Sequence, residues 1–179
     1  RRHSFPTRRS SDLKKSPLLI STATLLSVLY GLAWDPDPAA REAAAKTLEV
    51  ARASVWFYDE GKTKITCQNL YERDTGRHSA GTELEAAHFP AYFAALETER
   101  TIAAGDAHVD PRTAEFSVPY LAPLGISSML DVPIRVAGRM IGVVCHEHIG
   151  APRVWNADEE TFAYLMASFV GMALERSEE

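Results

Sequence analysis

Apolar and polar residues alternate most regularly in two neighbouring runs, residues 127–136 and 139–148, separated by Ala137-Gly138. A period of two places alternate side chains on opposite faces of a strand, and the Ala-Gly pair suits a tight reversal. The runs predict an antiparallel hairpin. Unbroken alternation puts one apolar set on a single face: Leu130, Val132, Ile134, Val136, Ile141, Val143 and Cys145. The other face mixes apolar with ionisable groups, and we expect it to line a ligand cavity: Met129, Asp131, Arg135, Met140, His146 and His148.

The rest of the chain alternates helical and strand-like patterns around this hairpin. Helices are predicted over 18–32, 38–50, 89–99 and 119–124, and strands over 53–59, 64–71 and 101–104. A closing helix starts after Asn156, because Asn156 and Glu159 have the spacing of a capping box. This order predicts an α+β fold: a central antiparallel sheet of five to six strands with helices on both faces.

The first thirteen residues, RRHSFPTRRSSDL, have no apolar period and resemble translated adapter sequence. We therefore treat 1–13 as a non-native leader and 14–179 as one domain, expected to be a fragment of a longer multidomain protein. The apolar run that follows the leader also suits a signal peptide or membrane helix. However, a stripe of small and polar residues along it favours a helix packed on protein, so no membrane insertion is expected.

The charge is unevenly placed. The chain has 19 basic and 24 acidic residues, and six of the basic ones lie within the first fifteen positions. The remaining body is strongly acidic, which argues against a nucleic-acid partner. Two cysteines, Cys67 and Cys145, lie in predicted strands and fit a reduced cytoplasmic protein with buried thiols better than a disulfide framework.

Four segments together resemble the GAF domain, a small-molecule sensor and dimerisation module of bacterial signalling proteins. They are ASVWFYD, YLAPLGISSMLDVPI, GRMIGVVCHEH and WNADEETFAYLMASFVGMALE. The resemblance implies a GAF/PAS-like sheet, a homodimer built by the first and last helices, and a ligand between the other sheet face and the middle helices. It also implies a non-catalytic regulator of an output domain in the same polypeptide, such as a histidine kinase or diguanylate cyclase.

Within this family the late segment is most similar to bilin-binding domains of phytochromes, through Tyr120, Leu121, Gly125 and Cys145-His146. The chromophore-linking cysteine of those domains would fall at Phe116, and their pyrrole-contacting histidine at Ser117. Covalent bilin binding is therefore not expected, and the ligand stays unknown.

The expected cover of the cavity adds three candidate ligand-binding residues, Arg112, Phe116 and Tyr120, to the five from the hairpin: Met129, Asp131, Met140, His146 and His148. Arg112 suits an anionic ligand, or is simply solvated. Two other functions stay open. One is a thiol- or metal-dependent enzyme using Cys145, His146 and His148, although His-x-His alone is a weak metal motif and neither a catalytic residue nor a metal site is assigned. The other is a dimerisation spacer whose cavity is filled by its own side chains.

Overall fold

The computed structural model describes residues 38–177. The leader at 1–13 and the helix predicted over 18–32 lie outside these residues. The structure is built on a seven-stranded sheet in which every pairing is antiparallel. The strands are β1 (Arg52–Tyr58), β2 (Lys64–Glu72), β3 (Arg77–Ser79), β4 (Glu83–Glu85), β5 (Ile102–Ala104), β6 (Ile126–Val136) and β7 (Arg139–Ile149).

The strands follow the order β3-β2-β1-β7-β6-β5, and β4 pairs with β2 beside β3. The long β6–β7 hairpin therefore lies at the centre, as predicted. The sheet prediction is confirmed, apart from the three-residue strands β3 and β4, which the sequence pattern did not indicate.

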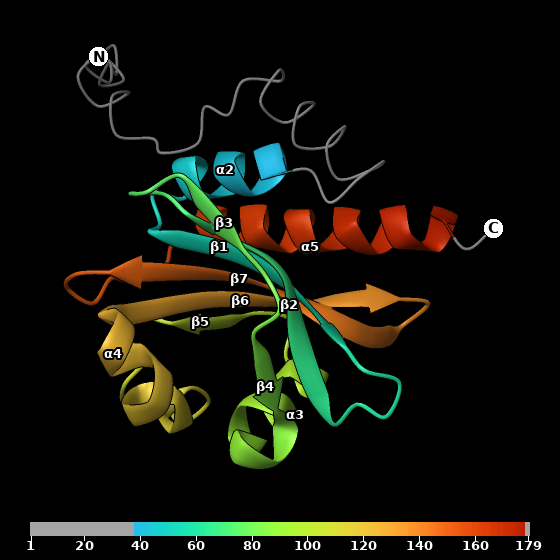
Figure 1. The fold of residues 1–179 in the computed structure, drawn as a ribbon, viewed down its shortest axis with the longest axis horizontal. Coiled ribbons are helices and arrows are strands. Elements are labelled where there is room, and N and C mark those ends of the chain that lie inside the picture. Colours follow the sequence, from blue (N-terminus) through green and yellow to red (C-terminus); the bar gives the residue numbers. More distant parts are fainter. Residues whose placement is uncertain (1–37, 178–179) are drawn as a thin grey trace, which may run out of the picture.

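Helices cover both faces of the sheet, so the predicted α+β class is also confirmed. Figure 1 shows α2 (Pro38–Thr47) and α5 (Ala157–Ser177) above the sheet, and α3 (Pro90–Thr98) and α4 (Ala122–Leu124) below it. Short helical turns precede α3 and α4: η2 (Ala86–His88), η3 (Ala114–Phe116) and η4 (Ser117–Leu121). We call the two sides the α5 face and the α3 face. No helix in the described part is both long and apolar enough to cross a membrane.

A reciprocal cap begins α5. The side-chain oxygen of Asn156 accepts hydrogen bonds from the backbone N–H of Asp158 and Glu159, both at 3.0 Å. The Glu159 carboxylate in turn accepts the Asn156 N–H at 2.9 Å. This is the capping box predicted from the sequence, and it fixes where α5 leaves the loop to lie along the sheet.

One β-bulge decides which side chains of β7 reach each face. Val136 pairs with Arg139 and Arg135 with Met140, as unbroken alternation requires, but Ile134 then pairs with Gly142. Ile141 is the extra residue, and an extra residue reverses the facing of everything beyond it. The prediction that Val143 and Cys145 share a face with Leu130 is therefore wrong. Val143, Cys145 and Glu147 lie on the α3 face.

Candidate functional site

The candidate site lies on the α3 face of the sheet, between its central strands and the covering segments α3, η3 and η4. Alternate residues of three adjacent strands point into it. They are Arg52, Ser54 and Trp56 of β1, Cys145 and Glu147 of β7, and Met129 and Asp131 of β6. These seven residues, which we call the charged grid, lie at the centre of the fold beneath α3, η3 and η4.

A buried ion pair occupies one end of the site. The Arg52 Nε lies 3.2 Å from Glu147 Oε2, and the two side chains are 9% and 3% exposed. The Tyr120 hydroxyl, from η4, donates to Glu147 Oε1 at 2.8 Å, and the Arg52 guanidinium lies 5.7 Å from the centre of the Tyr120 ring. Burial raises the pKa of Glu147, while Arg52 and the Tyr120 hydroxyl partly offset that rise. Burial and the nearby carboxylate raise the pKa of Tyr120, which keeps the phenol protonated as a donor.

A second buried carboxyl, Asp131, lies on β6, the strand next to that of Glu147. It accepts a hydrogen bond from the Tyr92 hydroxyl of α3 at 2.6 Å, and Cys145 Sγ lies 3.8 Å from the same hydroxyl. Burial is the main cause that raises the pKa of Asp131 to about 7. Burial and the carboxyls of Asp131 and Glu147 raise the pKa of the Cys145 thiol. This shift opposes thiolate formation at Cys145.

Four buried polar atoms of these charged groups have no hydrogen-bond partner among the described residues. They are Nε and Nη1 of Arg52, Oε2 of Glu147 and Oδ1 of Asp131. The contact between Arg52 Nε and Glu147 Oε2 is close enough for an ion pair, but it is misaligned for a hydrogen bond. A buried charged group with unmet hydrogen bonds is costly, so each such group calls for an explanation, of which a bound ligand is one. These atoms therefore mark the candidate ligand-binding centre.

The cavity above these groups is nearly filled by side chains. Its volume is about 10 Å³, room for about one water molecule. Aromatic packing closes it: the Phe116 ring stacks on Phe89 at 4.2 Å and meets Tyr92 edge-on at 4.8 Å. The lining residues are Trp56, Ile65, Leu84, Tyr92, Phe116, Tyr120, Met129, Cys145 and Glu147. A larger ligand therefore fits only if some of these lining side chains move.

The structure brings several of the sequence-predicted residues together here. Phe116, Tyr120 and Met129 line the cavity, and Asp131 lies in the same buried grid. Met140 is buried in the core of the α3 face but does not line the cavity. A ligand contact by any of them stays a prediction.

The two histidines lie on the other side of the sheet. His146 is directly opposite Leu130 and Ala53, both in the core under α2 and α5. The prediction that His146 and His148 share a face with Asp131 is wrong, because the bulge at Ile141 reverses their facing. The Nδ1 atom of His146 lies 2.9 Å from the Leu130 carbonyl oxygen, and burial lowers its pKa to about 4. Among the described residues, no three His, Cys, Asp or Glu side chains are grouped to hold a metal.

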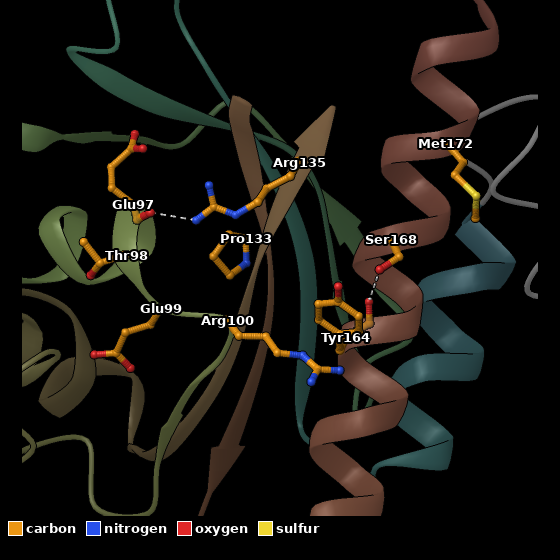
Figure 2. A pocket seen from close by; sticks show the side chains of 9 residues that line it. All are labelled: Glu97, Thr98, Glu99, Arg100, Pro133, Arg135, Tyr164, Ser168 and Met172. Carbon is orange, nitrogen blue, oxygen red and sulfur yellow. Dashed lines mark hydrogen bonds between the residues drawn. The ribbon is translucent and has the colours of Figure 1, made fainter. Parts of the chain in front are cut away.

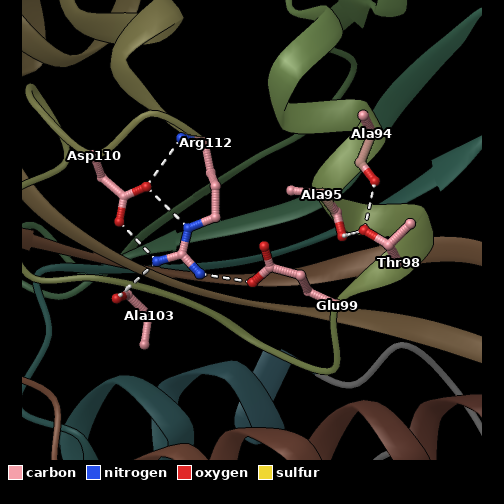
Figure 3. A network of polar contacts seen from close by, with 7 residues as sticks. All are labelled: Ala94, Ala95, Thr98, Glu99, Ala103, Asp110 and Arg112. Atoms are coloured by element: carbon pink, nitrogen blue, oxygen red, sulfur yellow. Dashed lines mark hydrogen bonds and ion pairs between the residues drawn. The ribbon is translucent and has the colours of Figure 1, made fainter.

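Arg112 is held by protein partners at the edge of the fold (Figure 3). Its Nε and Nη2 donate to the Asp110 carboxylate at 2.9 and 2.7 Å, and Nη1 donates to Glu99 at 2.6 Å. Nη2 also reaches the Ala103 carbonyl at 3.3 Å. This network fastens the loop before η3 to the start of β5. The anionic ligand predicted for Arg112 would have to replace one of these carboxylates.

A larger groove opens at the sheet edge between α3 and α5 (Figure 2). Its volume is about 530 Å³, and Arg100 lies over the Tyr164 ring at 3.9 Å. The guanidinium of Arg135 donates to the last carbonyls of α3, at Leu96 and Glu97. Of the residues expected from the sequence to face a ligand, only Arg135 borders this groove, which is separate from the buried charged grid.

Sequence reasoning missed three central residues of the site: Arg52, Tyr92 and Glu147. Arg52 had a usable signal, because Arg52, Ser54 and Trp56 alternate along a strand that is otherwise apolar. Unbroken alternation places Glu147 on the same face as Cys145, away from the expected cavity, and the bulge reverses that facing. Tyr92 lies in an apolar helix pattern, and nothing local in the sequence singles it out.

Comparisons with known proteins agree on the fold. The GAF domain family matches residues 37–174. A far-red absorbing protein solved in its dark state with bound biliverdin IXα superimposes with a TM-score of 0.69 at 14% identity, covering 87% of this chain and 99% of its own. The GAF domain of an Acinetobacter phosphoenolpyruvate-protein phosphotransferase gives 0.68 at 13%, covering 90% and 96%. Residues 122 to 287 of a methyl-accepting chemotaxis protein give 0.68 at 18%, covering 83% and 95%.

No curated protein matches the sequence. The solved structures share the fold at low identity, and they come from sensory and regulatory proteins. Since the family match spans most of the chain, including every strand of the sheet and the cover of the buried site, this chain belongs to the GAF domain family.

Proposed function

We propose that this domain senses a small molecule at the buried site of the α3 face and regulates an output module in the same polypeptide, such as a histidine kinase or diguanylate cyclase. One observation carries the proposal: Arg52, Glu147 and Asp131 are buried together under α3, η3 and η4 with unmet hydrogen bonds. Replacing buried charges with apolar residues is often neutral or stabilising, so stability alone does not explain three of them in one place.

The sheet supplies a route from this site to the output. β6 and β7 carry Asp131 and Glu147 on one face, and their opposite face packs against α5. We propose that two copies associate along α5, and that ligand binding changes the position of this helix in the cytoplasmic dimer.

Native mass spectrometry and thermal unfolding with a low-molecular-mass metabolite fraction test the sensing function. We expect a bound small molecule and a raised Tm, both lost in Glu147→Gln. Glu97→Gln is the matched control, because Glu97 borders the separate groove and pairs with Lys62. No bound molecule and no Tm change across the fraction would contradict sensing.

A second candidate function is a ligand-free dimerisation spacer, which the cavity volume of about 10 Å³ favours. This alternative predicts an unchanged Tm with every compound and a dimer whose stability does not depend on Glu147.

A further inference from the structure

We propose that the buried site binds a small zwitterion of the α-amino-acid type, with its carboxylate on Arg52 and its ammonium at the carboxyls of Glu147 and Asp131. This inference rests on the proposed sensing function and names the chemical class of its ligand.

The unmet atoms of the site form two complementary sets. Nη1 of Arg52 is a charged donor without an acceptor, and it suits one oxygen of a carboxylate, while Nε lies on another edge of the guanidinium and faces Glu147. Oε2 of Glu147 is an acceptor without a donor, and so is Oδ1 of Asp131 once that carboxyl has ionised; an ammonium has three N–H groups to offer. A ligand with one anionic and one cationic group offers a partner to both sets.

The register of the sheet sets the spacing between Arg52 and Glu147. Arg52 of β1 pairs directly with Glu147 of β7, and their charged atoms lie 3.2 Å apart. The ligand groups that meet them must therefore also be close neighbours. An α-amino acid carries its ammonium and carboxylate on one carbon, which fits this spacing better than charges separated along a chain.

The balance of charge excludes simpler ions. A plain anion would face two buried carboxyls, and a plain cation would face the Arg52 guanidinium at short range. Charges interact strongly where water is excluded, so either mismatch is penalised. The remaining groups that face the carboxyls carry no charge: the hydroxyls of Tyr92 and Tyr120, the Cys145 thiol and the His146 backbone N–H.

Tyr120 occupies the place of the ligand in this closed form. Its hydroxyl donates to Glu147 and its ring lies beside Arg52, so it partly substitutes for an ammonium and for a partner of the guanidinium. Tyr120 lies in η4, a π-helical turn that contains Pro119, and such turns are common at functional sites. Movement of Tyr120 would open space beside Trp56, Leu84 and Met129, which suit an apolar ligand side chain.

Isothermal titration with L-leucine and L-phenylalanine tests the inference. Each amino acid is paired with analogues that lack one charge: 3-methylbutylamine and 4-methylpentanoate for leucine, 2-phenylethylamine and 3-phenylpropanoate for phenylalanine. We expect at least one amino acid to bind at least about tenfold more tightly than both of its analogues, because each analogue leaves one charged set unmet. Equal binding by an analogue, or no binding by either amino acid, would overturn the proposal.

Two kinds of variant separate the contacts from folding. Arg52→Gln and Glu147→Gln should each lose binding while the far-ultraviolet circular dichroism stays unchanged. Tyr120→Phe should bind the amino acid about tenfold more tightly, because it removes the hydroxyl that competes for Glu147. A gain of affinity does not arise from misfolding, so unchanged or weaker binding by folded Tyr120→Phe counts against the proposal.

The outcome also distinguishes this inference from the sensing function. If a compound of another class, such as adenosine 3′,5′-cyclic monophosphate, binds and Glu147→Gln abolishes its binding, the sensing function is supported and the zwitterion proposal is overturned. If neither these compounds nor the metabolite fraction binds, both proposals fall.

Discussion

Asp131 and His146 lie on adjacent strands but respond to pH in opposite directions. Burial raises the pKa of Asp131 from 3.8 to about 7, so the folded state keeps a proton that the unfolded chain loses. The stability contributed by Asp131 is present below about pH 4 and is lost as pH rises to about 7. Burial lowers the pKa of His146 from 6.5 to about 4, so its effect on stability is reversed: stability falls as pH drops through that range. The two effects offset each other between about pH 4 and 6.5.

In Asp131→Asn, the effect of His146 protonation on stability should therefore no longer be offset. We expect the free energy of unfolding of the variant, relative to wild type, to rise by up to about 3 kcal/mol between pH 4.5 and pH 7.5. Urea unfolding at several pH values measures the difference. Asp74→Asn, an exposed change in the turn after β2, is the matched control. If the difference in free energy of unfolding between Asp131→Asn and wild type does not vary with pH, the raised pKa of Asp131 is contradicted.

At the scale of elements, the bulge in the β6–β7 hairpin depends on a close approach at Gly142. A Cβ at this position would collide with the Trp56 carbonyl oxygen and lie 2.6 Å from Phe57 Cδ1. Gly142→Ala should force β7 away from β1 and lower the free energy of unfolding by about 1–3 kcal/mol. Gly61→Ala is the control, because its Cβ would meet only ordinary contacts, the nearest at 3.4 Å. Chemical denaturation of both variants gives the comparison. Equal stabilities would contradict the prediction, because they would show that β1 moves to accept the added Cβ at little cost.

The elements themselves were largely predictable from the sequence, and the site only in part. Periodicity, a capping box and turn residues indicated the long strands and α5 because these signals are local. The facing of β7 was not predictable, since one extra residue in the pairing has no marker in the alternation of Ile141 to His148. Arg52 and Glu147 became partners only through the register of β1 with β7, which is a long-range property.

At the scale of the whole molecule, α5 keeps apolar side chains on its outer surface. Leu165 is 39% exposed and Met172 is 43% exposed, and their spacing of seven residues places them on one stripe. We expect two copies to associate there, together with the helix predicted over 18–32. Leu165→Glu should convert the dimer to a monomer in light scattering at micromolar concentration. Leu124→Glu, which changes a leucine of equal exposure on α4, should leave the dimer intact. A wild-type monomer, or a dimeric Leu165→Glu, would contradict this interface.

The bulge at Ile141 has a consequence for how such domains diverge. Adding or deleting one residue in this hairpin moves every later side chain of the strand to the opposite face of the sheet. Without the extra residue, His146 and His148 would face the ligand side, and Cys145 and Glu147 would turn towards α5. A single codon thus exchanges a carboxylate-and-thiol surface for an imidazole surface on the same scaffold. Relatives with hairpins of unequal length should be aligned by sheet face before their binding chemistry is compared.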